Sequence, residues 1–532
     1  MFRLVVVFLF IPVMVAAGFG VVDTIGGTYL DDLTSGPAWR MLVNTPGRGL
    51  HAIWMYAPDT DTLFPHRNMR YNFYDQSTDA WNWSDPDFMV SGQNVFPVRT
   101  GYGNIDIDTT GAAVISAHHT TASSIAPILA RDTDAGAGIF DYSPGEPVLD
   151  GYAWPCVGVG TNGYYHLAMM GVGADEGLYW SRMTAWPGWD SAVSISPPGP
   201  LPPTHNIATS KVPGSNKVCI TWVATPAVGH AQMPGFFRES TDGGDTWQAP
   251  VELGYPPGFH PGSETVPSFH VSSLFPLYDT EDNLHIVGNV APCVRDTGLV
   301  VPGQIWHWCP ANPDTWNLIR IASPDSWNAP CGRNAMVCDR PSLGQDRHGD
   351  LLAAWEEFDG VDVETTTNRL RADIWCSCSH DNGVTWWVTK VTDGGEVSNR
   401  FPSILNPIGD TVLVEYLIDQ VAGFWGAGEG PATENPVVVH RVYPDGLADG
   451  KNQTVRLRPT ATIARGVLVL DAAGSRQQTG YRAELLDVSG RKVMDLRVGD
   501  NDIRQLAPGV HFIREAQAQA QAQAVRKVVI TR

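Results

Sequence analysis

The chain has few basic residues. Its 35 lysines and arginines are outnumbered by 56 aspartates and glutamates, which gives a formal net charge of −21. A nucleic-acid partner is therefore not expected, because a protein that binds the phosphate backbone needs a positive surface. The balance suits a soluble extracellular surface, or weak cation binding by exposed carboxylates.

Helical periodicity is also missing. No long segment repeats its apolar residues with the period of a helix. The 54 glycines, 40 prolines and 19 tryptophans suit many short strands and tight turns instead. At 532 residues the chain is longer than one ordinary domain. An all-β fold with an additional small domain is expected.

A long apolar run occurs only at the N-terminus. Arg3 precedes an apolar stretch at 4–15, and the small residues Ala16, Ala17 and Gly18 follow. This order predicts a signal peptide over 1–17, because the run is short for a membrane span. No cysteine follows the cleavage site, so a lipoprotein is not expected. The mature chain is predicted to be secreted or on the cell surface, without a membrane span.

One eight-residue frame, Ser-x-Asp-x-Gly-x-Thr-Trp, occurs twice, at 240–247 and 379–386. Its Asp can accept hydrogen bonds from its own turn, and its Gly permits positive φ. Its Thr begins the returning strand, and its Trp buries a large ring between neighbouring sheets. The frame therefore predicts a structural hairpin turn, with these residues: Ser240, Asp242, Gly244, Thr246 and Trp247, and Ser379, Asp381, Gly383, Thr385 and Trp386.

Both copies resemble the Asp-box of sialidases and related BNR-repeat β-propellers. The resemblance implies a propeller, and it says little about activity because every role in the frame is structural. Paired hairpins recur seven times at a spacing of roughly 45 to 70 residues. We therefore predict a seven-bladed β-propeller over 20–445, with the segment 20–29 closing the ring. Six blades, the number in sialidases proper, is the alternative.

A Gly/Asp-rich linker at 445–452 precedes a second pattern of short strands. It predicts a small Ig-like β-sandwich over 446–532. The segments 485–493, 506–512 and 526–532 resemble the C-terminal sorting domain of type IX secretion cargo. The resemblance implies that secretion machinery is a partner, and an ordinary Ig-like accessory module is the alternative. The alternating Ala-Gln run near 516–524 is interpreted as an exposed hairpin loop.

Eight cysteines in an exported chain suggest disulfides, although their connectivity does not follow from the sequence. Cys331 and Cys338 are spaced to close a short loop. Cys376 and Cys378 lie two residues apart on one strand face and are not expected to pair. A metal site at this Cys-x-Cys is disfavoured, because a matching second half is missing. No metal and no cofactor are predicted.

Candidate ligand contacts lie at the start of the first strand of several units. The face on which these strands begin is called the top face. Convergent guanidinium groups there can bind a carboxylate bidentately, as the arginine triad of sialidases does. The alternative is salt bridging between blades. The candidates are Arg40, Arg99, Arg340 and Arg400, together with His118 after a second strand.

A sialidase also needs a tyrosine nucleophile with a glutamate and an aspartic acid. Tyr416 and Glu356 are the candidates here, with Glu357 and Asp359 close to the same end. Glu415 is adjacent to Tyr416 and so points to the other face of the strand. The Arg-Ile-Pro signature of the family is absent.

Three functions follow from these patterns. The favoured one is a secreted propeller that binds an extracellular glycan or protein on its top face. The second is an exo-acting glycoside hydrolase of sialidase type, and the third is a structural role in a surface layer.

Overall fold

The computed structural model covers two stretches of the chain. It describes residues 21–442, except 35, 174–175, 197–203, 225–232, 259–267, 295–296, 299–301, 313, 324–325 and 410. It also describes residues 462–530, except 465–466, 471–481, 498 and 517–522. The predicted signal peptide and linker lie outside the described residues. No described helix is long and apolar enough to cross a membrane.

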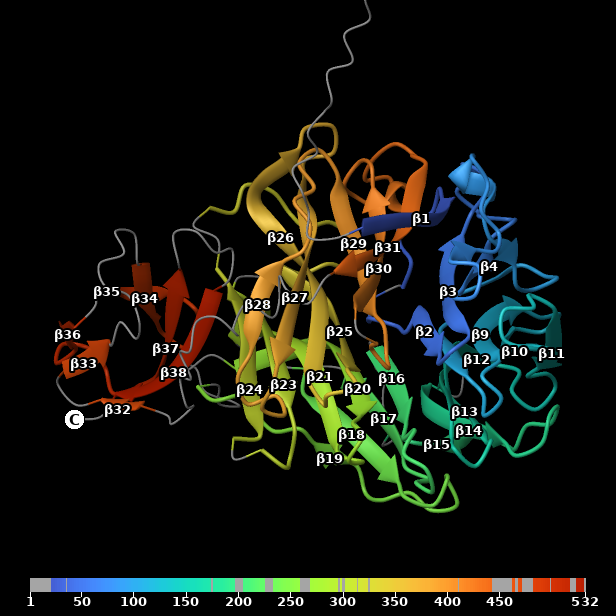
Figure 1. Cartoon of the computed structure of the whole chain (residues 1–532), viewed down its shortest axis with the longest axis horizontal. Coiled ribbons are helices and arrows are strands. Elements are labelled where there is room, and N and C mark those ends of the chain that lie inside the picture. The colour runs from blue at the N-terminus through green and yellow to red at the C-terminus, as the bar shows by residue number, and fades with distance from the viewer. Residues whose placement is uncertain are drawn as a thin grey trace, which may run out of the picture.

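The described chain is all-β, as predicted. Seven antiparallel sheets follow one another from residue 21 to residue 442, and Figure 1 shows them in order of colour. The first three sheets consist of β2 (Leu42–Thr45), β3 (Gly49–Tyr56), β4 (Asn68–Asp75), β5 (Ala80–Trp81) and β6 (Gln93–Asn94); β7 (Thr100–Gly101), β8 (Ile105–Ile107), β9 (Ala113–Thr120), β10 (Ile125–Asp132) and β11 (Phe140–Pro144); and β12 (Tyr152–Val159), β13 (Tyr165–Gly171), β14 (Gly177–Met183) and β15 (Val193–Ser194).

The next three sheets repeat this order. They consist of β16 (Thr204–Thr209), β17 (Val218–Val223), β18 (Gly235–Ser240) and β19 (Val251–Glu252); β20 (Ser268–Tyr278), β21 (Leu284–Val294), β22 (Thr297–Gly298), β23 (Gly303–Trp308) and β24 (Trp316–Ala322); and β25 (Cys338–Gln345), β26 (Leu351–Glu364), β27 (Arg369–Ser379) and β28 (Trp387–Lys390).

The last sheet joins the two ends of this region. It consists of β29 (Ser398–Ile404), β30 (Val412–Asp419), β31 (Asn435–Val442) and the N-terminal strand β1 (Val21–Thr28). β1 pairs antiparallel with β31, from Val21 opposite Arg441 to Thr28 opposite Asn435. The predicted pairing of 20–29 with the last unit is therefore present, and Figure 1 shows β1 beside β31. Two 3-10 turns are described, η1 (Phe88–Val90) and η3 (Trp425–Ala427).

Local turn chemistry explains the first hairpin of several sheets. Asp108, Asp279 and Asp346 each accept backbone N–H bonds two and four residues further on. An aspartate in this arrangement mimics a backbone turn and reverses the chain. One strand joined in this way, β26, buries Trp355, and β3 buries Trp54 in the same manner.

The two repeated frames have the same hydrogen bonds, at the ends of the third strands β18 and β27. Asp242 Oδ1 accepts from Thr246 N at 2.8 Å, and its Oδ2 accepts from the Thr246 hydroxyl at 2.6 Å. Asp381 and Thr385 repeat both distances. Since third strands run parallel to first strands, both turns lie on the bottom face, opposite the top face.

The C-terminal region forms short strands close to those predicted. They are β32 (Thr462–Ala464), β33 (Val467–Leu470), β34 (Arg482–Leu486), β35 (Lys492–Leu496), β36 (Gly499–Asp502), β37 (Gly509–Ala516) and β38 (Gln523–Ile530). β33 pairs with β36, and the others extend the sheet of β25–β28, because β38 pairs with β28. Leu486 and Phe512 share a buried cluster with Trp306. The region is therefore packed on the sheets of β20–β28 rather than separate from them.

The cysteines differ from the disulfide prediction. All eight are buried, reduced cysteines. Cys331 packs with Phe358 and Leu370 in a small cluster. The Cys338 thiol instead lies 3.6 Å from a carboxylate oxygen of Glu357. The proposed loop closure between Cys331 and Cys338 is therefore not formed.

Candidate functional site

The top face carries a repeated backbone irregularity. Large residues with positive φ recur at the top of four sheets. Trp154 (51°), Arg340 (51°) and Phe401 (60°) lie near the start of β12, β25 and β29, and Tyr102 (55°) lies between β7 and β8. The pairing register shifts at this point in β12, β25 and β29. Such bulges re-aim side chains, and positive φ costs free energy for these residue types. Strained positions of this kind gather at binding and active sites.

A small hollow opens at this end of the sheets. Its walls come from four distant segments: the residues after β1, those before β25, the bulge of β29 and the loop between β30 and β31. The side chains that matter chemically are Asp31, Asp32, Arg333, Arg400, Phe401 and Phe424.

Asp31 is the unusual carboxyl of the hollow. It is 3% exposed, its Oδ2 accepts from Trp425 N at 3.0 Å, and its Oδ1 is buried with no hydrogen-bond partner among the described residues. Burial raises the pKa of Asp31 to about 7; Asp32 adds to the shift and Arg400 opposes it. Burial and the neighbouring Asp31 also raise the pKa of Asp419 well above its usual range. Asp419 is therefore expected to hold its proton at neutral pH, whereas Asp31 titrates near it.

Glu429 holds one wall of the hollow in place. Its Oε2 accepts from Phe424 N at 2.9 Å and from Arg333 N at 3.1 Å, and its Oε1 pairs with Arg369 at 3.2 Å. Burial alone would raise the pKa of Glu429, but these donors outweigh it and lower the pKa. The Arg333 guanidinium lies over the Phe424 ring at 5.7 Å. A charged group and an aromatic face are thereby presented together.

Arg340 and Arg400 do meet at the top face, but they share a protein carboxylate. Glu356 accepts from Arg340 Nη1, from Arg400 Nε at 3.1 Å and from Phe401 N at 2.8 Å. Arg340 is 1% exposed and Glu356 is fully buried. Burial opposes the Glu356 charge, yet Arg340 and Arg400 lower the pKa of this glutamate. The alternative of salt bridging between sheets therefore describes Arg400, whereas Arg340 pairs with a glutamate of its own sheet. Of the two, only Arg400 borders the hollow.

The remaining predicted contacts are dispersed. Arg40 lies 3.8 Å from Asp106 of the neighbouring sheet. Arg99 donates to the carbonyls of Phe64 and Leu63. His118 accepts from Trp154 N at 3.0 Å, and burial, with Arg67 and Arg99, lowers the pKa of this histidine to about 3. None of the three lines the hollow.

Tyr416 and Glu356 are not brought together as a nucleophile and its activator. Tyr416 packs in the core between two sheets, 3% exposed, and its hydroxyl lies 3.3 Å from His440 Nδ1. Burial raises the pKa of Tyr416 above its usual range. Glu356 instead forms ion pairs with Arg340 and Arg400. Glu415 is buried with one oxygen unpaired among the described residues, and burial raises its pKa well above the ordinary value.

Sequence reasoning missed Asp31, Asp32, Arg333 and Phe424. One signal was available for the first two. These adjacent aspartates lie between Leu30 and Leu33, directly after β1, and the flanking leucines indicate that the segment is buried. Nothing in the sequence links them to the segment around 333 or to the loop at 424.

The chain was compared with known proteins in three ways. It matches no protein-family model, and no curated protein matches it. Among solved structures, an ulvan lyase has a TM-score of 0.48 and 11% identity, covering 80% of this chain and 96% of its own. An α-L-arabinanase from Penicillium chrysogenum, solved with arabinobiose, has a TM-score of 0.37 and 11% identity, covering 65% and 94%. A Hadza microbial sialidase has a TM-score of 0.36 and 12% identity, covering 73% and 75%. At this level the similarities carry no information about activity.

Proposed function

We propose that the seven sheets are the blades of a seven-bladed β-propeller whose top face binds carbohydrate in the hollow. The pairing of β1 with β31 supports a closed ring, since it completes the last sheet with the N-terminal strand. We also propose that the region 446–532 is an Ig-like module that secretion machinery recognises. The mature protein is proposed to be secreted or located on the cell surface.

The hollow suits a sugar because of its mixed lining. Carboxyl groups accept hydrogen bonds from sugar hydroxyls, and a guanidinium donates to them. Aromatic rings such as Phe401 and Phe424 cover apolar C–H faces. The observation that carries the proposal is Asp31, whose Oδ1 is buried without a partner among the described residues in a wall of the hollow. Because that oxygen has almost no exposed surface, a ligand hydroxyl would satisfy it once the Asp31 side chain turns toward the hollow.

Hydrolysis is the second candidate function, favoured by one observation. A carboxyl with a pKa of about 7 suits a general acid at neutral pH. A glycosidase pairs such an acid with an ionised carboxylate. Asp31 would be the acid and Asp32 the candidate carboxylate, in place of Tyr416 and Glu356.

A glycan array followed by calorimetry on the hits tests the binding proposal. Arg333→Ala and Phe424→Ala should each weaken binding by roughly 1.5–3 kcal/mol, because a charged donor or a covering ring is lost. Arg347→Ala is the matched control, since Arg347 lies in the β25–β26 turn on the bottom face. Equal affinity in all three variants, or an empty array, would refute the proposal.

The same hits test hydrolysis. The expected rate falls as pH rises through about 7, where Asp31 loses its proton, and Asp31→Asn removes the activity. Binding without turnover would leave the chain as a binding protein.

A further inference from the structure

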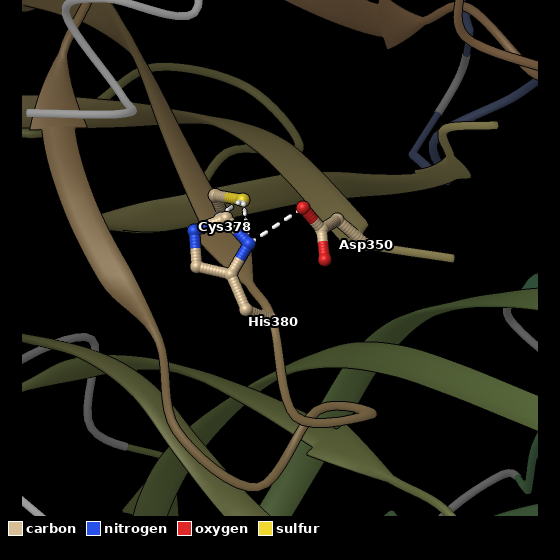
Figure 2. A group of neighbouring side chains, drawn as sticks. All are labelled: Asp350, Cys378 and His380. Atoms are coloured by element: carbon tan, nitrogen blue, oxygen red, sulfur yellow. Dashed lines mark hydrogen bonds and ion pairs between the residues drawn. The ribbon is translucent and has the colours of Figure 1, made fainter. Parts of the chain in front are cut away.

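A second cluster of side chains lies on the bottom face, far from the hollow. Asp350 stands directly before β26, Cys378 lies near the end of β27, and His380 follows that strand. Figure 2 shows the three side chains pointing toward one another. All three come from one sheet, because Leu351 pairs with Ser379 across β26 and β27.

The ligand atoms of the cluster are close together. One carboxylate oxygen, one thiol sulfur and one ring nitrogen lie within 4.8 Å of one another. His380 Nδ1 is 2.6 Å from Asp350 Oδ2, and the Cys378 sulfur is 3.9 Å from both ring nitrogens. His380 is nearly half exposed whereas Cys378 is buried, so an ion has access from the histidine side.

We propose that Asp350, Cys378 and His380 bind one divalent transition-metal ion of the zinc class, with a fourth position open to water. Tetrahedral zinc with bonds of about 2.0–2.3 Å separates its ligand atoms by about 3.3–3.7 Å. The His380–Asp350 contact is shorter than that range and the sulfur–nitrogen contacts are longer, so an ion would have to replace the His380–Asp350 hydrogen bond and draw the thiol closer. A set of one sulfur, one nitrogen and one oxygen selects such an ion over magnesium or calcium, which prefer oxygen alone.

The backbone beneath the ligands is held independently of any ion. Asp350 N donates to Asp346 Oδ1 at 2.9 Å, which closes the β25–β26 turn. Ser379 and Asp381 belong to the hydrogen-bonded frame that ends β27. The His380 ring also packs 5.0 Å from the Trp387 ring. Rigid supports of this kind keep ligands near a binding geometry.

The other copy of the frame shows that the turn does not require these residues. By the pairing of Val218 with Ser240, the positions of Asp350, Cys378 and His380 correspond there to Lys217, Glu239 and Thr241. That set cannot hold a zinc-class ion, yet its turn has the same hydrogen bonds. The three ligand types are therefore specific to the second copy. Of Cys376 and Cys378, only Cys378 belongs to the cluster. The search of the sequence for two matching cysteine pairs therefore did not find this site.

An ion at this position would join the β25–β26 turn to the end of β27. Because it would bind the folded state and not the unfolded chain, it would stabilise the fold by mass action. Its coordination would also displace the thiol proton of Cys378.

Cobalt binding to the reduced, full-length chain tests the proposal. The wild type should bind one Co²⁺ and develop a thiolate-to-cobalt charge-transfer band, which Zn²⁺ removes by displacement. Cys378→Ser should abolish the band. His380→Ala should weaken Co²⁺ affinity by roughly tenfold or more. Because the His380 side chain is nearly half exposed, this variant should fold like the wild type.

Cys376→Ser is the matched control, because Cys376 shares the strand and the buried cluster with Cys378. It should keep the band, and Zn²⁺ should raise its Tm as in the wild type but not that of His380→Ala. The proposal is wrong if the wild type shows no saturable band, if Cys378→Ser retains it, or if Cys376→Ser loses it to the same degree.

Discussion

Asp31→Asn is expected to stabilise the fold at alkaline pH and to weaken it in acid. The folded pKa of Asp31 is about 7 against 3.8 for the free side chain. A raised pKa means that the folded state holds the proton more tightly. The associated stability is fully present below pH 3.8, falls as pH rises, and is lost above about pH 7.

The size of the effect follows from the shift. A change from 3.8 to about 7 corresponds to roughly 4 kcal/mol of unfavourable free energy at pH 8. Asparagine removes this cost and keeps an acceptor for Trp425 N. It also buries an unpaired amide N–H group, which costs about 1–2 kcal/mol. The net gain should be roughly 2 kcal/mol at pH 8, and the net loss about 1–2 kcal/mol at pH 3.5.

Urea unfolding between pH 3.5 and 8.5, followed by tryptophan fluorescence, measures this difference. Asp359→Asn, at an exposed position on β26, is the control and should change the free energy of unfolding little at either pH. A difference between Asp31→Asn and wild type that stays constant across the range would refute the reasoning.

Three further outcomes are expected. Glu356→Gln should lower the free energy of unfolding by about 3–5 kcal/mol, because the buried guanidinium groups of Arg340 and Arg400 lose the carboxylate that they share. Glu396→Gln, at an exposed position, is the control and should leave the free energy of unfolding unchanged. Equal denaturation midpoints for the two variants would contradict the prediction. Asp242→Ala should cost about 1–2 kcal/mol without changing ligand affinity. Hydrogen bonds from Thr246 lower the pKa of Asp242 to about 2, so this contribution should be present above pH 3.8 and vanish toward pH 2. Deleting 467–532 should leave the region 21–442 folded but with Trp306 uncovered, so that it binds more of a hydrophobic dye and stays in the cell envelope. Normal export of this variant would show the sorting interpretation to be wrong.

The parts of the fold that the sequence predicted depend on local chemistry. The two frames specify their turns within eight residues, so their hydrogen bonds could be anticipated from Asp242 and Asp381 alone. The pairing of the segment 20–29 with the last unit could be anticipated, because that unit had no clear fourth strand of its own. The strands of the C-terminal region could be predicted from the alternation of apolar and polar residues. Their packing against Trp306 could not be predicted, because no local sequence pattern indicates which surfaces contact each other.

The hollow could not be predicted because its chemistry is non-local. Arg340 and Arg400 were correctly assigned to one end of the sheets. Their neutralisation by Glu356 depends on the register between β25 and β26 and on the packing of β29 against them. Likewise, the raised pKa of Asp31 depends on how deeply the loop carrying Trp425 buries it. Four separate segments must meet before any of these properties exists.

The pairing of β1 with β31 also has a kinetic consequence. It joins Asp23 to Arg441, 418 positions apart, so this pairing cannot form until β31 has been synthesised. Contacts of such sequence separation form slowly, and until then the edge of β31 offers unpaired backbone groups to other chains. The pairing is thus a late folding step of the region 21–442, and a protease or a pulling force acting at the N-terminus would release β1 before any other strand of this region. An export route that delivers the chain unfolded would leave this step to be completed outside the cell.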